Sequence, residues 1–89
     1  MSKDLSTTVV EVYTRPQCSL CDDALERLQE ARRALGFTLV ERNIFDRADW
    51  FSWYRYRVPV VHVDGIERLA LQFSQAELEA ALASGKSQP

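Results

Sequence analysis

The sequence predicts a single α/β domain in which a four-stranded mixed sheet carries helices on both faces. Segments that alternate β-branched or aromatic residues with polar ones are interspersed with segments whose apolar residues recur at helical spacing. The order is strand, helix, strand, helix, strand, strand, helix (βαβαββα), and an Asp-Gly turn joins the last two strands. With 89 residues, of which 46% are hydrophobic, the chain has material for one core of this kind.

The first strand is predicted over residues 8–14, where β-branched and aromatic residues alternate with polar ones. It ends before Pro16, which lacks the N–H that a strand ladder requires. The first helix is predicted over residues 20–35, because its apolar residues recur every three or four positions. Two aspartates in its first turn suit the positive end of the helix dipole, and Gly36 suits its C-terminal end.

The second strand is predicted over residues 37–43, again from alternation, and a helical crossover most naturally returns it parallel to the first. Asp46 is interpreted as an N-cap, and residues 47–56 as a short helix packed on the sheet. That segment holds five aromatic residues, Trp50, Phe51, Trp53, Tyr54 and Tyr56. The small apolar volume of the domain favours core packing for them, and a surface for docking a partner is the alternative.

Strands three and four are predicted over residues 58–63 and 66–72, as antiparallel neighbours across the Asp-Gly turn. Ser74 and Glu77 have the spacing of an N-terminal capping box. A last helix is therefore expected to begin there and to run to about residue 83.

The domain is expected over residues 9–84, with a disordered tail over residues 1–8 and a C-terminal tail over residues 85–89. The N-terminus is polar, without the apolar stretch of a secretory signal, and no apolar run has the length of a membrane span. We therefore expect a cytoplasmic monomer with no membrane partner. A net charge of −2 gives no basic field for a nucleic acid, so none is expected as a partner.

Chemistry is expected at the two cysteines, Cys18 and Cys21, which stand where the first strand gives way to the first helix. A helix N-terminus favours an anion, so we expect the pKa of the Cys18 thiol to lie below its usual value of about 8.5. Cys21 lies three residues after Cys18, close enough for the two cysteines to form a disulfide. The pair predicts dithiol-disulfide exchange with Cys18 as the nucleophile, Cys21 as the resolving thiol and no cofactor.

The same cysteine spacing also occurs in zinc and iron-sulfur sites. Structural zinc takes four ligands, whereas this chain offers two thiols and one distant His62, which we interpret as a polar residue on a strand face. The alternative to a redox function is thus a non-enzymatic binding module that shares a metal across a dimer. A purely structural pair of cysteines is a further alternative, which a reducing compartment disfavours.

Two segments together resemble the glutaredoxin-like proteins of the thioredoxin superfamily. They are VYTRPQCSLC at residues 12–21 and RVPV at residues 57–60, with the Asp-Gly hairpin beyond. The resemblance covers about residues 9–82 and implies a thioredoxin-like fold. It also implies a cis peptide bond before Pro59, beside the cysteines, and a Val58 backbone that pairs antiparallel with a bound thiol peptide.

The resemblance further implies that Arg15 contacts the carboxylate of glutathione. A solvated loop charge is the alternative for Arg15, and both interpretations apply to Arg57. Ser74 is expected to present a helix N-terminus to a carboxylate. The family usually has a Gly-Gly turn and a Cys-Asp or Ser-Asp helix start here, whereas this chain has Phe-Ser-Gln at residues 73–75. We therefore expect weak glutathione binding, with protein or small-molecule disulfides as substrates and a dithiol or a reductase as electron donor.

Overall fold

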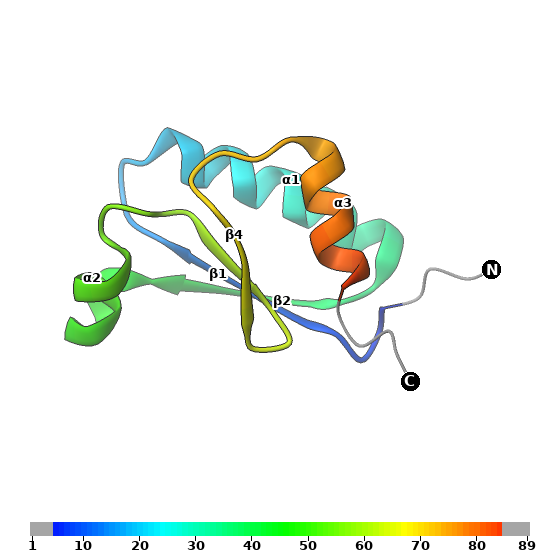
Figure 1. The fold of residues 1–89 in the computed structure, drawn as a ribbon, viewed down its shortest axis with the longest axis horizontal. Coiled ribbons are helices and arrows are strands. Elements are labelled where there is room, and N and C mark those ends of the chain that lie inside the picture. Colours follow the sequence, from blue (N-terminus) through cyan, green and yellow to red (C-terminus); the bar gives the residue numbers. More distant parts are fainter. Residues whose placement is uncertain (1–4, 85–89) are drawn as a thin grey trace.

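A computed structural model describes residues 5–84 and shows a four-stranded sheet covered by helices (Figure 1). The strands follow the order β2-β1-β3-β4 across the sheet. β1 runs parallel to β2 and antiparallel to β3, and β3 runs antiparallel to β4. The predicted mixed sheet is confirmed. The strands are β1 (Val9–Thr14), β2 (Thr38–Asn43), β3 (Val60–Val63) and β4 (Ile66–Ala70).

The helices follow the predicted order, with one short addition after β2. They are α1 (Ser19–Leu35), the 3-10 turn η1 (Ile44–Asp46), α2 (Ala48–Tyr54) and α3 (Gln75–Ala83). The addition makes the prediction of Asp46 as an N-cap wrong, because Asp46 is the last residue of η1 and Arg47 holds the N-cap position of α2, without a capping hydrogen bond from its side chain. The capping side chain is that of Asn43, which accepts a hydrogen bond from the Phe45 N–H at 2.9 Å and so starts η1.

Two apolar clusters hold the layers together. The larger one lies between one face of the sheet and the two long helices, and Figure 1 shows α1 and α3 together over that face. It contains Val10, Val12, Leu28, Phe37, Val61, Val63, Leu78 and Leu82. The smaller cluster contains Tyr13, Cys18, Cys21, Ile44, Tyr54, Val58 and Val60. Since Tyr13 points away from the face that carries Val12, α2 packs on the opposite face at this end of the sheet.

The folded part of the chain begins earlier than predicted. The Leu5 N–H donates to the Leu35 carbonyl at 2.8 Å, and the Thr38 N–H donates to the Thr8 carbonyl at 3.0 Å. Leu5 packs against the larger cluster and Thr8 is buried. Residues 5–8 are therefore ordered, whereas the sequence predicted a disordered tail there. The contacts that order them are made with distant residues, and such contacts leave no periodic pattern in the sequence. Residues 1–4 and 85–89 of the two predicted tails lie outside the described residues.

Capping explains where the two long helices end or begin. Gly36 adopts a φ of 85° and its N–H donates to the Arg32 carbonyl at 2.7 Å, which closes α1. The predicted capping box of α3 is present, with the Ser74 Oγ accepting from the Glu77 N–H at 3.0 Å and the Ser74 N–H donating to Glu77 Oε1 at 2.8 Å. Within residues 5–84, none of the helices combines the length and apolar character needed to cross a membrane.

Candidate active site

Cys18 and Cys21 are joined by a disulfide at the start of α1, with their Cα atoms 5.2 Å apart. Cys18 is the N-cap residue, in an extended conformation with φ −130° and ψ 103°, and its Sγ accepts a hydrogen bond from the Cys21 N–H at 3.1 Å. The chain turns into this position at Gln17, whose φ is 57°. A backbone donor of the first helical turn is therefore already directed at Cys18 Sγ, where it would also meet a thiolate.

The two cysteines differ in accessibility, and Cys18 is the more exposed. Cys18 is 7% exposed and Cys21 is 1% exposed. Cys18 is nevertheless largely covered, because in the disulfide form both cysteines belong to the smaller apolar cluster, together with Tyr13 and Val58. A substrate disulfide would reach Cys18 through the narrow part of the surface that remains open.

That opening is a pocket of about 400 Å³ beside Cys18. Its walls come from the loop before α1, the first turn of α1, the end of α2 and the segments that flank β3 and β4. The residues that line it include Arg15, Leu20, Arg55, Tyr56, Val58 and Leu71. The pocket therefore brings Cys18 together with two cations and several apolar side chains.

Of the predicted substrate-binding residues, the pocket brings together Arg15 and Val58 with Cys18. Arg15 Nη1 donates to the Pro16 carbonyl at 3.2 Å and to the Gln17 carbonyl at 3.3 Å, so its guanidinium braces the loop before the cysteine. The Val58-Pro59 peptide bond is cis, as the resemblance implies, and Pro59 is fully buried.

Arg57 and Ser74 do not line this pocket. The Arg57 guanidinium pairs with the carboxylate of Glu67 on β4 and lies over the Tyr54 ring, 5.7 Å from its centroid. The Ser74 hydroxyl is occupied by the capping box of α3. The capping box was predicted from the sequence, whereas the Glu67 partner of Arg57 was not, because the two residues lie ten positions apart and meet only across the β3-β4 hairpin.

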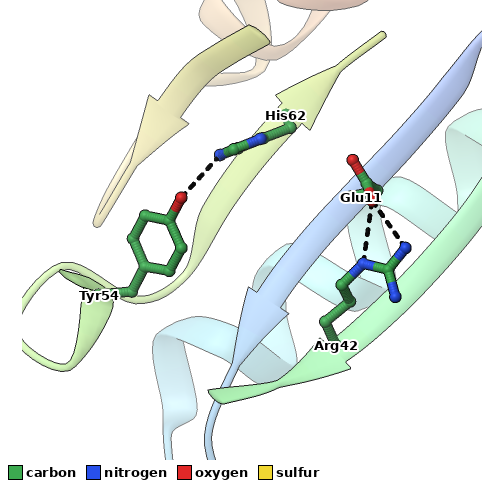
Figure 2. A network of polar contacts seen from close by, with 4 residues as sticks. All are labelled: Glu11, Arg42, Tyr54 and His62. Atoms are coloured by element: carbon green, nitrogen blue, oxygen red, sulfur yellow. Dashed lines mark hydrogen bonds and ion pairs between the residues drawn. The ribbon is translucent and has the colours of Figure 1, made fainter. Parts of the chain in front are cut away.

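A polar aromatic network next to the site was missed by sequence reasoning, which interpreted His62 only as a face residue. His62 Nε2 lies 3.3 Å from the Tyr54 hydroxyl (Figure 2). The Tyr13 ring packs against both, with its centroid 4.8 Å from that of Tyr54 and 5.0 Å from that of His62. Burial lowers the pKa of His62, against the opposing effect of the Glu11 and Glu67 carboxylates.

An ion pair extends the same sheet face toward β2. Arg42 Nε and Nη2 donate to Glu11 Oε2 at 2.9 and 2.7 Å, as Figure 2 shows. The Arg42 guanidinium also lies over the Trp50 ring, 5.6 Å from its centroid. Alternation in the first predicted strand already indicates that Glu11 and Tyr13 lie on the same face of the sheet. In the structure, Glu11 also pairs with His62 of β3, so the ion pair and the aromatic network share that face.

The aromatic residues of the second helical segment divide between core and surface. Tyr54 is buried, and Trp50 and Phe51 are partly buried against the smaller cluster. Trp53 and Tyr56 are 58% and 79% exposed. Within residues 5–84, no three His, Cys, Asp or Glu side chains are grouped as ligands of one metal ion would be, so a shared metal would have to draw its further ligands from elsewhere.

Comparisons with known proteins agree with the fold described above. Residues 9–83 match the family model described as Glutaredoxin-like domain (DUF836). The X-ray structure of target protein XcR50 from X. campestris is 35% identical to this chain, with a TM-score of 0.71, and the match covers 85% of this chain and 97% of that one. The solution NMR structure of protein Ne2328 from Nitrosomonas europaea is 24% identical, with a TM-score of 0.70 over 82% of this chain and 88% of that one, and supports the fold alone.

Proposed function

The chain belongs to the glutaredoxin-like domain family, and from this premise we propose that it is a thiol-disulfide oxidoreductase that reduces disulfides through Cys18 and Cys21. The observation that carries the proposal is the disulfide at the N-cap of α1, where the Cys21 N–H donates to Cys18 Sγ. When the pair is reduced, the same N–H and the positive end of a 17-residue helix favour the thiolate of Cys18.

The reaction proceeds in two exchanges. The Cys18 thiolate attacks one sulfur of the substrate disulfide, a mixed disulfide forms, and the other substrate sulfur leaves as a thiolate that takes up a proton. Cys21 then loses its proton and attacks Cys18 Sγ, which closes the Cys18-Cys21 disulfide and releases the second substrate thiol. Two electrons pass from the protein to the substrate, and a dithiol or a reductase returns them to the protein.

Substrate is held, in this proposal, along the Val58-Pro59 segment. Val58 lines the pocket beside Cys18, and within residues 5–84 its N–H and C=O take part in none of the backbone hydrogen bonds outside helices and strands. An extended peptide can therefore pair with both groups. Arg57 could contribute only by releasing Glu67, and Ser74 only through the backbone at the start of α3.

Glutathione is proposed to be a poor donor for this protein. Arg15 is available to a carboxylate, but residues 73–75 lack the aspartate and the paired glycines that bind glutathione in the related proteins. Loss of one charge-assisted contact weakens binding by roughly tenfold or more, because such a contact is worth about 1.5 to 3 kcal/mol. We further propose that the protein is a cytoplasmic monomer and that a dithiol or a reductase supplies its electrons.

Reduction of a fluorogenic peptide disulfide, with dithiothreitol as donor, tests the function. We expect turnover above the uncatalysed rate for the wild type and background rates for Cys18→Ser. Ser52→Ala, an exposed serine of α2 outside the Cys18 pocket, is the matched control and should keep its activity. Metal content and mass of the purified protein test the alternative, a non-enzymatic module that binds a metal across a dimer. A metal-bridged dimer without reductase activity would favour that binding function over the redox function.

A further inference from the structure

The Cys18 pocket carries two arginines and no acidic side chain in its lining. Most of the other arginines with a described side-chain contact are neutralised by an Asp or Glu. These pairs are Arg27–Asp23, Arg42–Glu11, Arg47–Asp49 and Arg57–Glu67. Arg15 and Arg55 have no such pair within residues 5–84, although the chain as a whole has a net charge of −2. Arg32, Arg33 and Arg68 also have no such pair within the described residues, but Arg15 and Arg55 are the two arginines that line the pocket beside Cys18.

Aromatic rings hold the Arg55 guanidinium in place. Its central carbon lies 4.8 Å from the centroid of the Tyr56 ring and 5.3 Å from that of the Phe51 ring. Contacts of this kind use the faces of the guanidinium and leave its N–H edges open. Those edges match a carboxylate, which can accept two parallel hydrogen bonds. Arg15 is braced through Nη1 alone, so it too keeps N–H groups for a ligand.

Apolar side chains surround the two arginines. Tyr56 is 79% exposed, Leu71 is 47% exposed and Leu20 is 37% exposed, and all three line the pocket. They come from the end of α2, the segment after β4 and the first turn of α1. A small acidic thiol does not need these exposed apolar side chains, whereas a peptide chain that crosses the pocket would cover them.

We propose that this pocket selects protein disulfides whose cysteine is flanked by acidic residues, with Arg55 and Arg15 binding the flanking carboxylates and Tyr56 and Leu71 packing against neighbouring apolar residues. The inference rests on the proposed reductase function and specifies its substrate class. Arg55 acts in it as a residue that determines specificity, at a distance from the exchanging sulfurs, and takes no part in the bond changes.

The test compares three disulfide-bonded peptides that differ only in whether Glu, Gln or Lys flanks the cysteine. With dithiothreitol as donor and at low ionic strength, we expect kcat/KM to be highest for the Glu peptide and lowest for the Lys peptide. Arg55→Gln should lower kcat/KM for the Glu peptide by about three- to tenfold and leave the Gln peptide unchanged. Arg55→Glu should reverse the preference toward the Lys peptide. Arg68→Gln, an exposed arginine outside the pocket, is the control and should change none of these values.

A second measurement does not depend on redox chemistry. The Glu peptide with serine in place of cysteine should bind the oxidised protein and broaden or shift the NMR signals of Arg55 and Tyr56. If the wild type reduces none of the three peptides, the reductase function itself fails. If it reduces all three at equal rates, or if the serine peptide does not bind, acidic selection is refuted and the reductase function stands. Faster reduction of glutathione disulfide than of the Glu peptide would also refute the proposal that a peptide occupies the pocket.

Discussion

Replacing Ser74 by alanine should weaken the start of α3 and leave substrate binding unchanged. Ser74 Oγ accepts from the Glu77 N–H at 3.0 Å, and the change removes this acceptor while the helix retains the rest of its contacts. The Glu77 N–H is exposed and can donate to water instead. The free energy of unfolding should therefore fall by the amount typical of a lost N-cap, about 1 kcal/mol. α3 supplies Leu78 and Leu82 to the larger cluster, and the loss should therefore appear in the global free energy of unfolding.

Urea denaturation followed by tryptophan fluorescence measures this effect. A slope of about 1 to 1.5 kcal/mol/M converts the loss into a midpoint lower by about 0.7 to 1 M. Ser74→Asp keeps an N-cap acceptor and should retain most of the stability. Unchanged stability in Ser74→Ala, together with a higher KM for disulfide substrates, would refute the capping role and return Ser74 to the substrate site.

Three further predictions concern the core, the network and the donor. Leu28→Ala removes a fully buried side chain from the larger cluster and should cost about 2 to 5 kcal/mol in a urea titration, whereas the exposed Leu71→Ala should cost far less. Because burial lowers the pKa of His62 from 6.5, the unfolded chain takes up a proton first as the pH falls, so stability present at pH 7 is lost below about pH 6.5. His62→Gln should reduce that loss, and equal pH dependence in both proteins would contradict it. In stopped-flow experiments dithiothreitol should reduce the Cys18-Cys21 disulfide rapidly and glutathione slowly, and saturable reduction at low glutathione concentration would show the opposite.

Local patterns in the sequence were sufficient for the order of elements and for the parallel first pair of strands. Alternation, helical spacing, the Asp-Gly turn and the capping box at Ser74 act over a few residues, and each has its expected counterpart in the structure. The cis bond before Pro59 came from the family resemblance, because nothing in the composition distinguishes it.

Contacts between residues that lie far apart in the chain were not predicted from the sequence. The Leu5 N–H bond to Leu35 and the pairing of Arg57 with Glu67 are decided by where the strands and helices meet in space. The same is true of Arg55, which reaches the cysteine pocket because α2 ends beside it. Sequence reasoning thus identified the cysteine pair and, of the residues that line its pocket, Arg15 and Val58, but it did not identify Arg55, Tyr56 or Leu71.

Trapping the mixed disulfide tests most directly whether Cys18 attacks and Cys21 resolves. Reduced Cys21→Ser, incubated with a peptide disulfide, should accumulate a covalent adduct whose mass equals that of the protein plus one peptide thiol, less two hydrogens, and peptide mapping should locate it on Cys18. Cys18→Ser should form little adduct under the same conditions. A stable adduct on Cys21 in Cys18→Ser, with none in Cys21→Ser, would contradict the assignment of both cysteines.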